Sequence, residues 1–394
     1  MRVALFRDPT SIHIQKWSRA LRSRGIEVVT IAVDQGRSEL LRREQQIVIT
    51  EVFSSNILTR AVRFVLRRAG FSGWIHKQLA KQLDEELVRW NVEILHVHGI
   101  QFYGEVASYL EFRPYLVSIY GSDIFQAKTD RTTFDHYVKC FEGSCFVESS
   151  SSYAARFARD NYGFDESKIK VFPWGVDLES FRYRPELTPE LREKYGIRVE
   201  DTVIYSHRSL NPVYNYRVLL EAVQLVSKEY PHLKFILIKG NGKPENVEFT
   251  RKFLEENDLV GSVLFFDQYL PDEQIVEFYQ LSDAFISIPE TDNIADSLME
   301  GMAMQCFPIL GDVPTYRDIF SEENAVIIPD HDNPENVAEG LRRFIQRQDK
   351  KDVVERNYKF ARNQTWHNVA ERQITLYHEC ANITPFSWDE KSQG

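Results

Sequence analysis

The sequence predicts an α/β protein made of two doubly wound domains, each with a parallel sheet covered by helices. Three observations support this prediction: the length, an alternation of short apolar runs with helical patterns, and a break in that alternation near residue 180. At 394 residues, the chain is too long for one compact core and suits two domains of about 100–200 residues each. Its composition, 43% hydrophobic and 27% charged, is that of an ordinary globular protein.

The first part of the chain alternates short apolar runs with segments of helical periodicity. Met1–Phe6 is predicted as a buried strand, Ile14–Arg24 as a helix closed by Gly25, and Glu27–Val33 as a second strand, which together make a βαβ opening. Further strands are expected at Glu93–His98, Tyr115–Ile119 and Ser144–Val147. Strands that alternate with helices in this way form a parallel sheet with helices on its faces.

The alternation stops at Phe172–Arg184, which is rich in proline, glycine and aromatic residues, and then starts again. The second series of strands is expected at Thr202–Ser206, Lys234–Lys239, Ser262–Phe266, Ala284–Ile288 and Phe307–Leu310. The helices between them are expected at Tyr216–Glu229, Pro244–Asn257, Asp272–Leu281 and Ser297–Met304. Because doubly wound sheets bind ligands at the carboxyl ends of their strands, the residues that follow these strands are the candidates for a functional site.

The charge of the chain is unevenly distributed. The formal net charge of −10 argues against a nucleic-acid-binding protein. Residues 1–90 carry 16 basic and 9 acidic side chains, whereas the rest of the chain carries 32 basic and 49 acidic ones. Within residues 56–70, apolar side chains repeat at helical spacing and four arginines lie mostly away from them. This segment is either a solvated helix face over the core or a docking surface for an anionic membrane.

The cysteines and the N-terminus bear on the compartment. Cys140, Cys145, Cys306 and Cys380 include no C-x-x-C pair, which predicts neither a disulfide framework nor a zinc ribbon and favours a reducing compartment. The N-terminal apolar run is too short for a signal peptide, and no stretch approaches roughly 18 apolar residues. We therefore expect a cytoplasmic protein, placed peripherally on the inner face of the membrane if residues 56–70 dock there.

The strongest candidate site lies in residues 286–307, ISIPETDNIADSLMEGMAMQCF, where an apolar strand leads through a polar loop into a helix. Asp296 or Ser297 is the expected N-cap. The amide groups at such a helix start, with the positive end of the helix dipole, suit a phosphate. Glu300 lies one turn into the helix on the face of Ser297, where it can accept hydrogen bonds from a sugar diol. The alternative is that Glu300 is only a favourable first-turn acid and Asp292 only a loop residue.

Two further loops follow predicted strands of the second domain. Arg208 comes after the strand Thr202–Ser206, and its guanidinium can grip a phosphate in a cleft, although a surface ion pair is the commoner role for an arginine. Gly240, Asn241 and Gly242 follow the next strand and allow the backbone to approach a ligand closely, although Asn-Gly is first of all a turn signal.

Two strand ends of the first domain carry polar side chains. His96 and His98 share one face of the strand Glu93–His98, and no third metal ligand stands nearby. We expect His96 to pack in the core and His98 to line a cleft. Asp123 ends the run Tyr-Gly-Ser-Asp and is either a cleft carboxylate or an Asx-turn residue.

Together these segments resemble the retaining glycosyltransferases of family 4, which have the GT-B fold. Asp292 and Glu300 are spaced like the family's E-x7-E motif, with Asp in the first place. Three other stretches are similar to family signatures: MEGMAMQCFPIL to LEAMA-x-G-x-P-V-I, FPWGVDLESF to P-N-G-V-D-x-x-x-F, and LIKGNGK to a strand followed by a Gly-Asp-Gly turn. Trp366–Tyr377 resembles the tryptophan-bearing helix that crosses back onto the first domain in this family.

The resemblance implies two Rossmann-like doubly wound domains that face a cleft. The first, at residues 1–178, would bind the acceptor, and the second, at residues 179–365, would bind the nucleotide sugar. Residues 366–394 would form a C-terminal helix that crosses back to the first domain.

The implied activity is transfer of a sugar, with retention, from a nucleotide-diphosphate sugar to a glycan, a lipid-linked acceptor or a small molecule. No cofactor is implied, and no metal is required, since no Asp-x-Asp motif stands at a fitting strand end. The nucleoside diphosphate leaves with negative charge, which Arg208 and the amides of residues 293–298 are expected to stabilise.

Within this hypothesis each candidate residue has a role. Glu300 binds the ribose and Asp292 binds hydroxyls of the transferred sugar, while His98 and Asp123 face the acceptor and the reacting carbon. The catalytic set is therefore Asp292, Arg208, His98 and Asp123. The donor site also includes Gly240, Asn241, Asn293, Ile294, Ala295, Ser297, Leu298 and Glu300, and the acceptor side is formed by His13, His98 and Tyr120.

The sequence also departs from the family pattern. Pro212-Val213-Tyr214 occupies the region where the family carries a lysine after its arginine, and Arg217, Lys239 or Lys243 are candidates to supply the missing charge. Tyr120 stands where many members have a histidine. Trp174 replaces the hinge asparagine, and Asp8–His13 replaces a glycine-rich loop.

Two other functions remain open on the sequence. A hydrolysing sugar-nucleotide epimerase would share the two-domain cleft and act on the donor alone. A catalytically silent GT-B protein would bind a sugar nucleotide or act as a scaffold, which the missing lysine and histidine allow. A nicotinamide oxidoreductase is disfavoured because no G-x-G-x-x-G follows the first strand.

Overall fold

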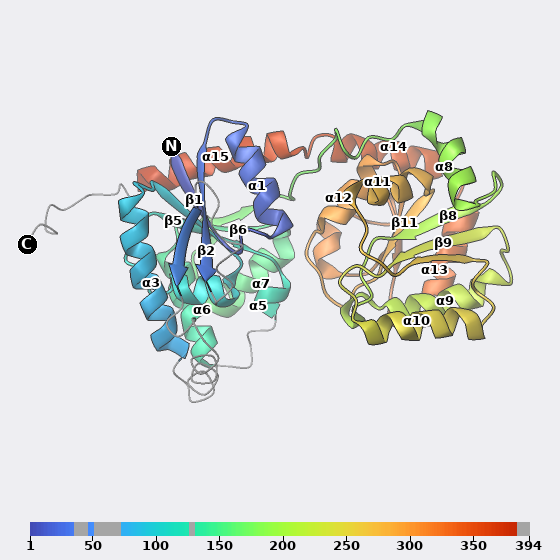
Figure 1. Cartoon of the computed structure of the whole chain (residues 1–394), viewed down its shortest axis with the longest axis horizontal. Helices are drawn as coiled ribbons and strands as arrows, with labels where there is room; N and C mark the ends of the chain where they lie inside the picture. Colours follow the sequence, from blue (N-terminus) through green and yellow to red (C-terminus); the bar gives the residue numbers. More distant parts are fainter. Residues whose placement is uncertain (35–45, 51–71, 126–130, 384–394) are drawn as a thin grey trace, which may run out of the picture. The chain divides into compact units, whose positions relative to one another are not determined.

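The computed structural model describes residues 1–34, 46–50, 72–125 and 131–383 (Figure 1). By its internal contacts the chain divides into two compact units. Unit 1 comprises Met1–Pro173 together with Trp366–Gly394, and unit 2 comprises Trp174–Thr365. Residues 56–70, the basic segment that the sequence offers as a membrane-docking surface, lie outside the described residues.

Unit 1 is built on a seven-stranded sheet with the order β3-β2-β1-β4-β5-β6-β7, in which every neighbouring pair is parallel. The strands are β1 (Arg2–Phe6), β2 (Glu27–Asp34), β3 (Gln46–Thr50), β4 (Ile94–His98), β5 (Tyr115–Ile119), β6 (Val147–Ser149) and β7 (Ile169–Val171). The order reverses between β1 and β4, which is the switch point of a doubly wound fold. The predicted fold class is therefore confirmed for this unit.

Helices cover both faces of this sheet. They are α1 (Ile12–Arg22), α3 (Ser72–Arg89), α4 (Glu105–Ala107), α5 (Ser122–Phe125), α6 (Arg131–Gly143), α7 (Ser152–Tyr162) and α15 (Trp366–Ile383). One face has an apolar core in which strand residues such as Val97 and Val117 pack against α3, α6 and α7. The other face is covered by α1 and by α15, which lie side by side (Figure 1).

Unit 2 repeats the design with a six-stranded parallel sheet of order β10-β9-β8-β11-β12-β13. Its strands are β8 (Thr202–Ser206), β9 (Leu233–Ile238), β10 (Val263–Phe266), β11 (Ala284–Ser287), β12 (Phe307–Gly311) and β13 (Val326–Ile328). Its helices are α8 (Thr188–Tyr195), α9 (Tyr216–Ser227), α10 (Pro244–Glu256), α11 (Asp272–Leu281), α12 (Asp296–Ala303), α13 (Pro334–Gln346) and α14 (Lys350–Ala361). The prediction of a second doubly wound sheet is confirmed.

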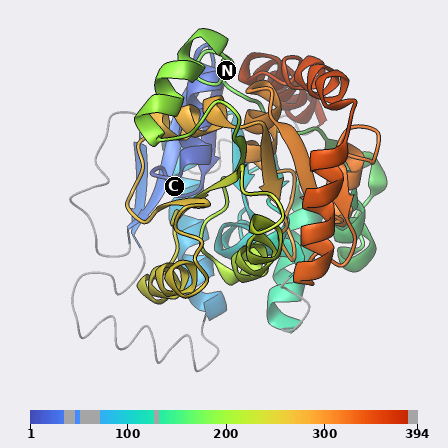
Figure 2. The same ribbon diagram turned by 90° about the vertical axis from the view of Figure 1, so that its right-hand side faces the viewer.

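Successive residues of β8 serve the two cores of unit 2. Ile204 packs into a core with α9, α10 and α13, whereas Val203 and Tyr205 pack into a core with α11 and α12. Figure 2 shows α13 lying along the sheet. Because both faces are buried, the strand reads as a continuous apolar run rather than as an alternation of apolar and polar residues.

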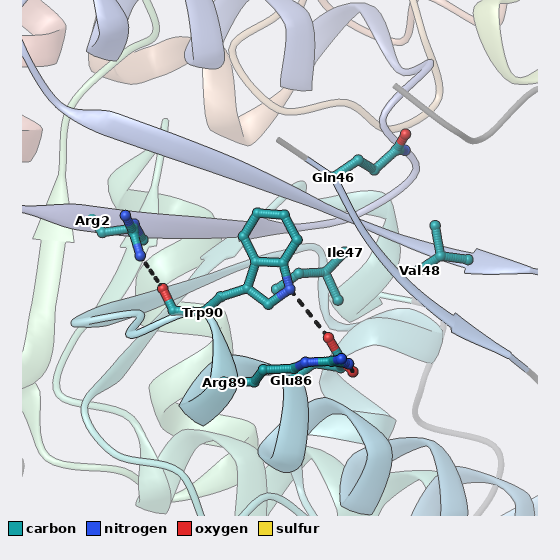
Figure 3. A pocket seen from close by; sticks show the side chains of 7 residues that line it. All are labelled: Arg2, Gln46, Ile47, Val48, Glu86, Arg89 and Trp90. Atoms are coloured by element: carbon teal, nitrogen blue, oxygen red, sulfur yellow. Dashed lines mark hydrogen bonds and ion pairs between the residues drawn. The ribbon is translucent and has the colours of Figure 1, made fainter. Parts of the chain in front are cut away.

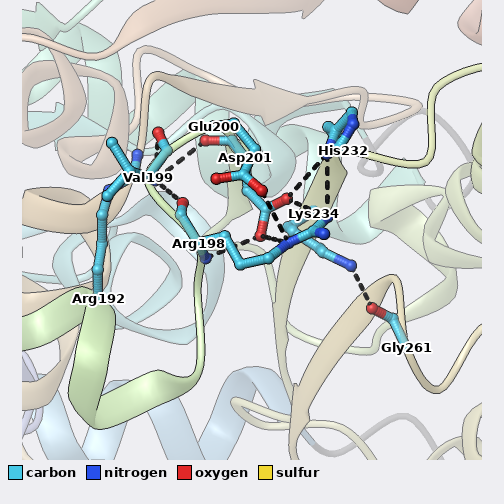
Figure 4. A network of polar contacts seen from close by, with 8 residues as sticks. All are labelled: Arg192, Arg198, Val199, Glu200, Asp201, His232, Lys234 and Gly261. Atoms are coloured by element: carbon cyan, nitrogen blue, oxygen red, sulfur yellow. Dashed lines mark hydrogen bonds and ion pairs between the residues drawn. The ribbon is translucent and has the colours of Figure 1, made fainter.

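The amino end of the unit 2 sheet is closed by a polar network at the loop before β8 (Figure 4). Asp201 accepts hydrogen bonds from the backbone amide and the guanidinium of Arg198, both at 2.9 Å. The same guanidinium lies 2.9 Å from the ring of His232, and Arg192 donates to the backbone oxygen of Asp201 at 3.0 Å. This network fixes the entry into β8 at the edge opposite to the one where ligands bind in such folds.

The second face of the unit 1 sheet carries a buried polar network that α15 completes. The ring of His96 contacts the hydroxyls of Ser118 and Tyr377, both at 2.7 Å. Ser118 donates to Glu148 at 2.8 Å, and Gln373 donates to the other oxygen of the same carboxyl at 2.5 Å. Tyr377 and Gln373 belong to α15, so this helix supplies hydrogen bonds that the buried sheet face requires.

A disulfide also ties α15 to the sheet, whereas the sequence, which has no C-x-x-C pair, predicts no disulfide framework. Cys145, just before β6, is bonded to Cys380 of α15, with their Cα atoms 5.6 Å apart. Cys140 and Cys306 are buried free thiols. The pairing escaped the sequence because the two residues lie 235 positions apart and only the return of the chain brings them together. The reducing compartment inferred from the cysteines loses its basis.

The disulfide predicts the number of thiols that the protein exposes on unfolding. In denaturant without a reductant, Cys140 and Cys306 should react with a thiol reagent and Cys145 and Cys380 should not, which gives two reactive thiols per chain. Reduction before the assay should raise the number to four. A Cys145→Ser, Cys380→Ser double variant should give two in both conditions. Four reactive thiols in the unreduced wild type would contradict the pairing.

The buried carboxyl of Glu148 predicts a pH dependence of stability. Burial raises its pKa from 4.5 to about 7, against the hydrogen bonds from Gln373 and Ser118, which lower it. Because the pKa is higher in the folded chain, the stability that this group contributes is full below about pH 4.5 and is lost as the pH rises through about 7. The side chain introduced by Glu148→Gln cannot ionise. As the pH rises from about 4.5 to 7, the free energy of unfolding of the wild type should therefore fall by about 3 kcal/mol relative to that of the variant.

Urea unfolding of both proteins between pH 4.5 and 8 measures this difference. Burial lowers the pKa of His96 to about 3, so protonation of this histidine in the unfolded chain costs stability as the pH falls below about 6.5. That effect is present in both proteins and cancels in the comparison. Parallel stability profiles would show that Glu148 is not held neutral.

Candidate functional site

The loop after β11 and the start of α12 form the centre of the candidate site in unit 2. The helix begins at Asp296, and Ala295 is its N-cap with an extended backbone (φ −78°, ψ 147°). The expected N-cap at Asp296 or Ser297 was therefore wrong by one or two positions. An alanine has no polar side chain that could cap the first amides of α12. The positive end of the helix dipole therefore stays available to a ligand at this N-terminus.

Arg208 reaches this helix start from the carboxyl end of β8. One terminal nitrogen of its guanidinium donates to Ser297 Oγ at 3.1 Å, and the other donates to Asp292 Oδ2 at 2.6 Å. Its side chain is 10% exposed, and its guanidinium carbon lies 4.1 Å from the centre of the Tyr214 ring. The structure thus brings together three predicted site residues, Arg208, Asp292 and Ser297, from three different segments.

The electrostatics of Arg208 suit an anion-binding role. Burial is the largest influence and lowers its pKa, but Asp292, followed by Tyr316, Tyr214 and Tyr279, raises the pKa above its ordinary value, so the guanidinium stays charged. Its Nε–H group is buried and has no hydrogen-bond partner within the part of the chain that the structure describes. A buried donor without a partner is costly, and one within a charged group is a natural contact for an anionic ligand.

Glu300 lies one turn into α12 and is 6% exposed. Its Oε2 is 3.6 Å from Nδ1 of His207, which is 2.9 Å from the hydroxyl of Tyr279. Tyr279 donates to the backbone oxygen of Ser297 at 2.8 Å. The carboxylate is therefore held at the same helix start as Arg208, as its spacing from Ser297 predicts.

The loop after β9 packs against the loop after β8. Gly240 has a φ of +51°, and a Cβ on it would lie 2.5 Å from the Cβ of Ser209, so only glycine fits there. The amide of Leu210 donates to the backbone oxygen of Lys239 at 3.0 Å. These contacts place the turn with Gly240 and Asn241 beside the residue that follows Arg208.

The remaining residues predicted for the donor site differ in whether their side chains or only their backbone groups can contact a ligand. Ile294 and Leu298 are 3% and 0% exposed and pack into the core with α11, so only their backbone groups can serve a ligand. Asn293 is buried, and its amide donates to Asp292 Oδ1 at 2.9 Å. Ala295 packs against the same core and contributes its backbone as the N-cap.

The four predicted residues of unit 1 also lie together. The rings of His13 and Tyr120 are 5.5 Å apart, and the hydroxyl of Tyr120 lies 3.3 Å from the ring of His98. Asp123 accepts from the amide of Tyr120 at 3.0 Å and from the amide of Ile100 at 2.9 Å. Both carboxylate oxygens thus accept from backbone amides that precede Asp123 in the chain, and not from the amide two residues further on that an Asx turn would use. Burial raises the pKa of Asp123.

His98 does not line a surface in unit 1, contrary to the expectation that it lines a cleft. It is 0% exposed, stacked on His96 at 3.8 Å and packed against Trp17 of α1. Burial lowers the pKa of His98 well below its ordinary value, so the ring is neutral. Alternation along β4 predicts that both histidines share a face, but it does not reveal that α1 and α15 cover that face.

Sequence reasoning missed several side chains that build the site. His207 and Tyr214 flank Arg208 in the chain, so their place in the same loop was the available signal. For Tyr316, which contacts Asp292, the sequence held no such signal, because a tyrosine after a strand is most often a core residue. In unit 1, Arg7 was also missed; it donates to the backbone oxygen of His98 at 3.2 Å and lies 4.1 Å from the Tyr120 ring centre.

A hollow of about 510 Å³ lies elsewhere on unit 1 (Figure 3). Arg2, at the amino end of β1, bonds the backbone oxygen of Trp90 in its wall, and Glu86 accepts from the indole of Trp90 at 3.1 Å. Its full lining is Arg2, Gln46, Ile47, Val48, Glu86, Arg89 and Trp90. None of the predicted site residues lines it, since they follow the carboxyl ends of strands.

Two features of the described residues concern metals and membranes. Among the described residues, no group of three or more His, Cys, Asp or Glu side chains is placed to hold a metal ion. Within the same part of the chain, every helix is too short or too polar to cross a membrane.

Solved structures with the same fold define the class of protein. Sucrose-phosphate synthase from Thermosynechococcus elongatus superposes with a TM-score of 0.78 at 14% identity, over 98% of this chain and 100% of that one. HepE of Anabaena, solved in complex with UDP and glucose, superposes with a TM-score of 0.70 at 16% identity, over 96% of this chain and 99% of that one. Two doubly wound units with this topology constitute the GT-B fold.

Sequence comparison then gives the family. Residues 10–180 match the model described as Glycosyltransferase Family 4, and residues 188–362 match the model described as Glycosyl transferases group 1. The chain therefore belongs to the group 1 glycosyltransferases of family 4, and the resemblance seen in its motifs is confirmed. Spore coat protein SA of Bacillus subtilis is 23% identical over 256 residues, which are 61% of this chain and 66% of that protein. The curated relatives that the chain matches are each aligned over less than two thirds of their own length.

Proposed function

We propose that this protein transfers a sugar from a nucleoside-diphosphate sugar to an acceptor hydroxyl. The observation that carries the proposal is the buried guanidinium of Arg208, whose Nε–H has no partner and which lies at the uncapped start of α12. A diphosphate is the ligand that satisfies such a donor and the positive helix end together. The complex of HepE with UDP and glucose supports a uridine diphosphate sugar as the first donor to try.

In the proposed reaction the bond between the anomeric carbon and the diphosphate oxygen breaks, and the diphosphate keeps the electron pair. A new bond forms between that carbon and the acceptor oxygen, whose proton is released. Arg208 stabilises the negative charge that develops on the leaving diphosphate in the transition state, and this lowers the barrier to breaking the bond. Glu300, at the same helix start, accepts hydrogen bonds from the ribose.

Unit 1 is proposed to bind the acceptor, which is a glycan, a lipid-linked molecule or a small molecule. His13, Tyr120 and Arg7 gather at the carboxyl ends of β1 and β5, the edge at which this fold binds ligands. Retention of the anomeric configuration, independence of metal ions, and a peripheral membrane position for residues 56–70 belong to the same proposal and rest on the family resemblance and on the sequence.

The first test is donor binding. Thermal unfolding with a panel of UDP, GDP, ADP and CDP sugars should show stabilisation by at least one of them, since a ligand at 100 times its Kd adds about 2.7 kcal/mol to the free energy of unfolding. Product analysis with and without acceptors then separates a transferase from an epimerase, which converts the donor alone. A protein that binds a donor and converts nothing would be the silent alternative.

The second test removes the diphosphate contact. Arg208→Ala should lower kcat about 100-fold to 1000-fold, because removing one charge-stabilising donor costs about 3–4 kcal/mol in the transition state. The matched control is Arg342→Ala, which removes an arginine of α13 that pairs with Glu229 and should leave the rate unchanged. Near-normal turnover in Arg208→Ala would overturn the assignment of this residue.

The third test concerns the ribose. Glu300→Gln keeps the shape of the side chain but weakens its capacity to accept, so the KM for the donor should rise about 10-fold. Competition by the corresponding 2′-deoxynucleoside diphosphate gives the second measurement, since the variant should distinguish it less well from the ribonucleotide. If wild type and Glu300→Gln distinguish the deoxynucleotide from the ribonucleotide equally well, Glu300 does not bind the ribose.

A further inference from the structure

Tyr316 is a buried tyrosine that the proposed function does not use. It belongs to the short 3-10 helix at Pro314–Asp318, after β12, and is 1% exposed. Its hydroxyl donates to Asp292 Oδ2 at 2.9 Å and lies 3.2 Å from Ser287 Oγ at the end of β11. Burial first, and the charge of Asp292 second, raises the pKa of Tyr316 well above its ordinary value, so the phenol keeps the proton that it donates.

The carboxylate of Asp292 accepts hydrogen bonds at both of its oxygens. Its Oδ2 accepts from Tyr316 and from the guanidinium of Arg208 at 2.6 Å, and its Oδ1 accepts from the amide of Asn293 at 2.9 Å. The neighbouring Thr315 donates to the backbone oxygen of Asp292 at 2.9 Å. A carboxylate offers about four acceptor positions, and three of them are filled here. This arrangement leaves little capacity for hydroxyls of a transferred sugar.

The same contacts fix the orientation of Arg208. Asp292 holds one terminal nitrogen, Ser297 holds the other, and the ring of Tyr214 lies 4.1 Å from the guanidinium carbon. Among the described residues, the buried Nε atom has no hydrogen-bond partner, so its N–H is open to a ligand. A long arginine side chain would otherwise have several rotamers, and a pre-set orientation spares the ligand the cost of ordering it.

We propose that Tyr316 and Asp292 are positioning residues, which hold Arg208 so that its unpartnered donor receives the diphosphate, and that Asp292 acts through Arg208 rather than on the transferred sugar. This inference rests on the proposed function. It revises the expectation that Asp292 binds sugar hydroxyls, and it adds a tyrosine to the donor site.

The test compares two probes for each variant. The wild-type full chain is titrated calorimetrically with UDP, GDP, ADP and CDP, and the diphosphate that binds most tightly is used with its glucose ester. Tyr316→Phe removes only the hydroxyl and changes no charge. Its affinity for the free diphosphate and for the sugar ester should fall by the same factor, about 10-fold, because one hydrogen bond to a charged group is lost. Its affinity for the nucleoside alone should not change, whereas a general loss of structure would weaken all three probes.

Asp292→Asn distinguishes the two roles of the carboxylate by a ratio. The ratio is the affinity for the sugar ester divided by the affinity for the free diphosphate. If Asp292 acts through Arg208, Asp292→Asn should change both affinities by the same factor, so the ratio should equal that of wild type. If Asp292 binds the sugar, the ratio should fall. Ser287→Ala is the matched control, because it removes the other hydroxyl near Tyr316 and keeps the contact with Asp292. Its affinities should equal those of wild type.

The outcomes separate the inference from the proposed function. A wild-type chain that binds none of the diphosphates overturns both. Diphosphate binding with unchanged affinity in Tyr316→Phe, or a lowered ratio in Asp292→Asn, overturns the inference alone. If Tyr316→Phe does not fold, the ratio in Asp292→Asn decides the matter.

Discussion

The buried charge of Arg208 is the constraint on which the ligand-binding edge of unit 2 depends. A guanidinium that is 90% removed from solvent is stable only with a carboxylate and hydrogen-bond acceptors around it. Asp292 supplies the carboxylate, Ser297 an acceptor, and Tyr316 holds the carboxylate in place. These residues follow β8, β11 and β12 or begin α12, so one charged group ties together the loops at the carboxyl ends of three neighbouring strands.

Unit 1 meets a different constraint on one face of its sheet. His96, Ser118 and Glu148 come from three adjacent strands and point to the same side, which places polar groups where a core would ordinarily be apolar. Such groups are tolerated in a buried position only when their hydrogen bonds are made. Gln373 and Tyr377 of α15 make them, so the last helix is part of the core of unit 1 and not an appendage.

The fold follows from the sequence because it depends on patterns that repeat: apolar strands, amphipathic helices and the break near residue 180. The site follows in part, since the residues after β8, β9 and β11 must meet at one edge of a parallel sheet. What escaped prediction depends on packing. Ala295 is an N-cap through its backbone conformation and not its side-chain type, and the burial of His98 depends on helices far away in the chain. The partner of Tyr316 and the pairing of Cys145 with Cys380 likewise exist only once the chain has folded.

The return of the chain at residue 366 has a practical consequence for dissection. Unit 1 is discontinuous in sequence, because α15 and its disulfide partner Cys145 are separated by the whole of unit 2. A fragment that simply stops at residue 173 would lack the hydrogen bond from Gln373 to Glu148 and the contact of Trp366 with Trp17. A self-standing version of this unit requires residues 366–383 to be spliced back by a linker, whereas unit 2 can be excised as one uninterrupted piece.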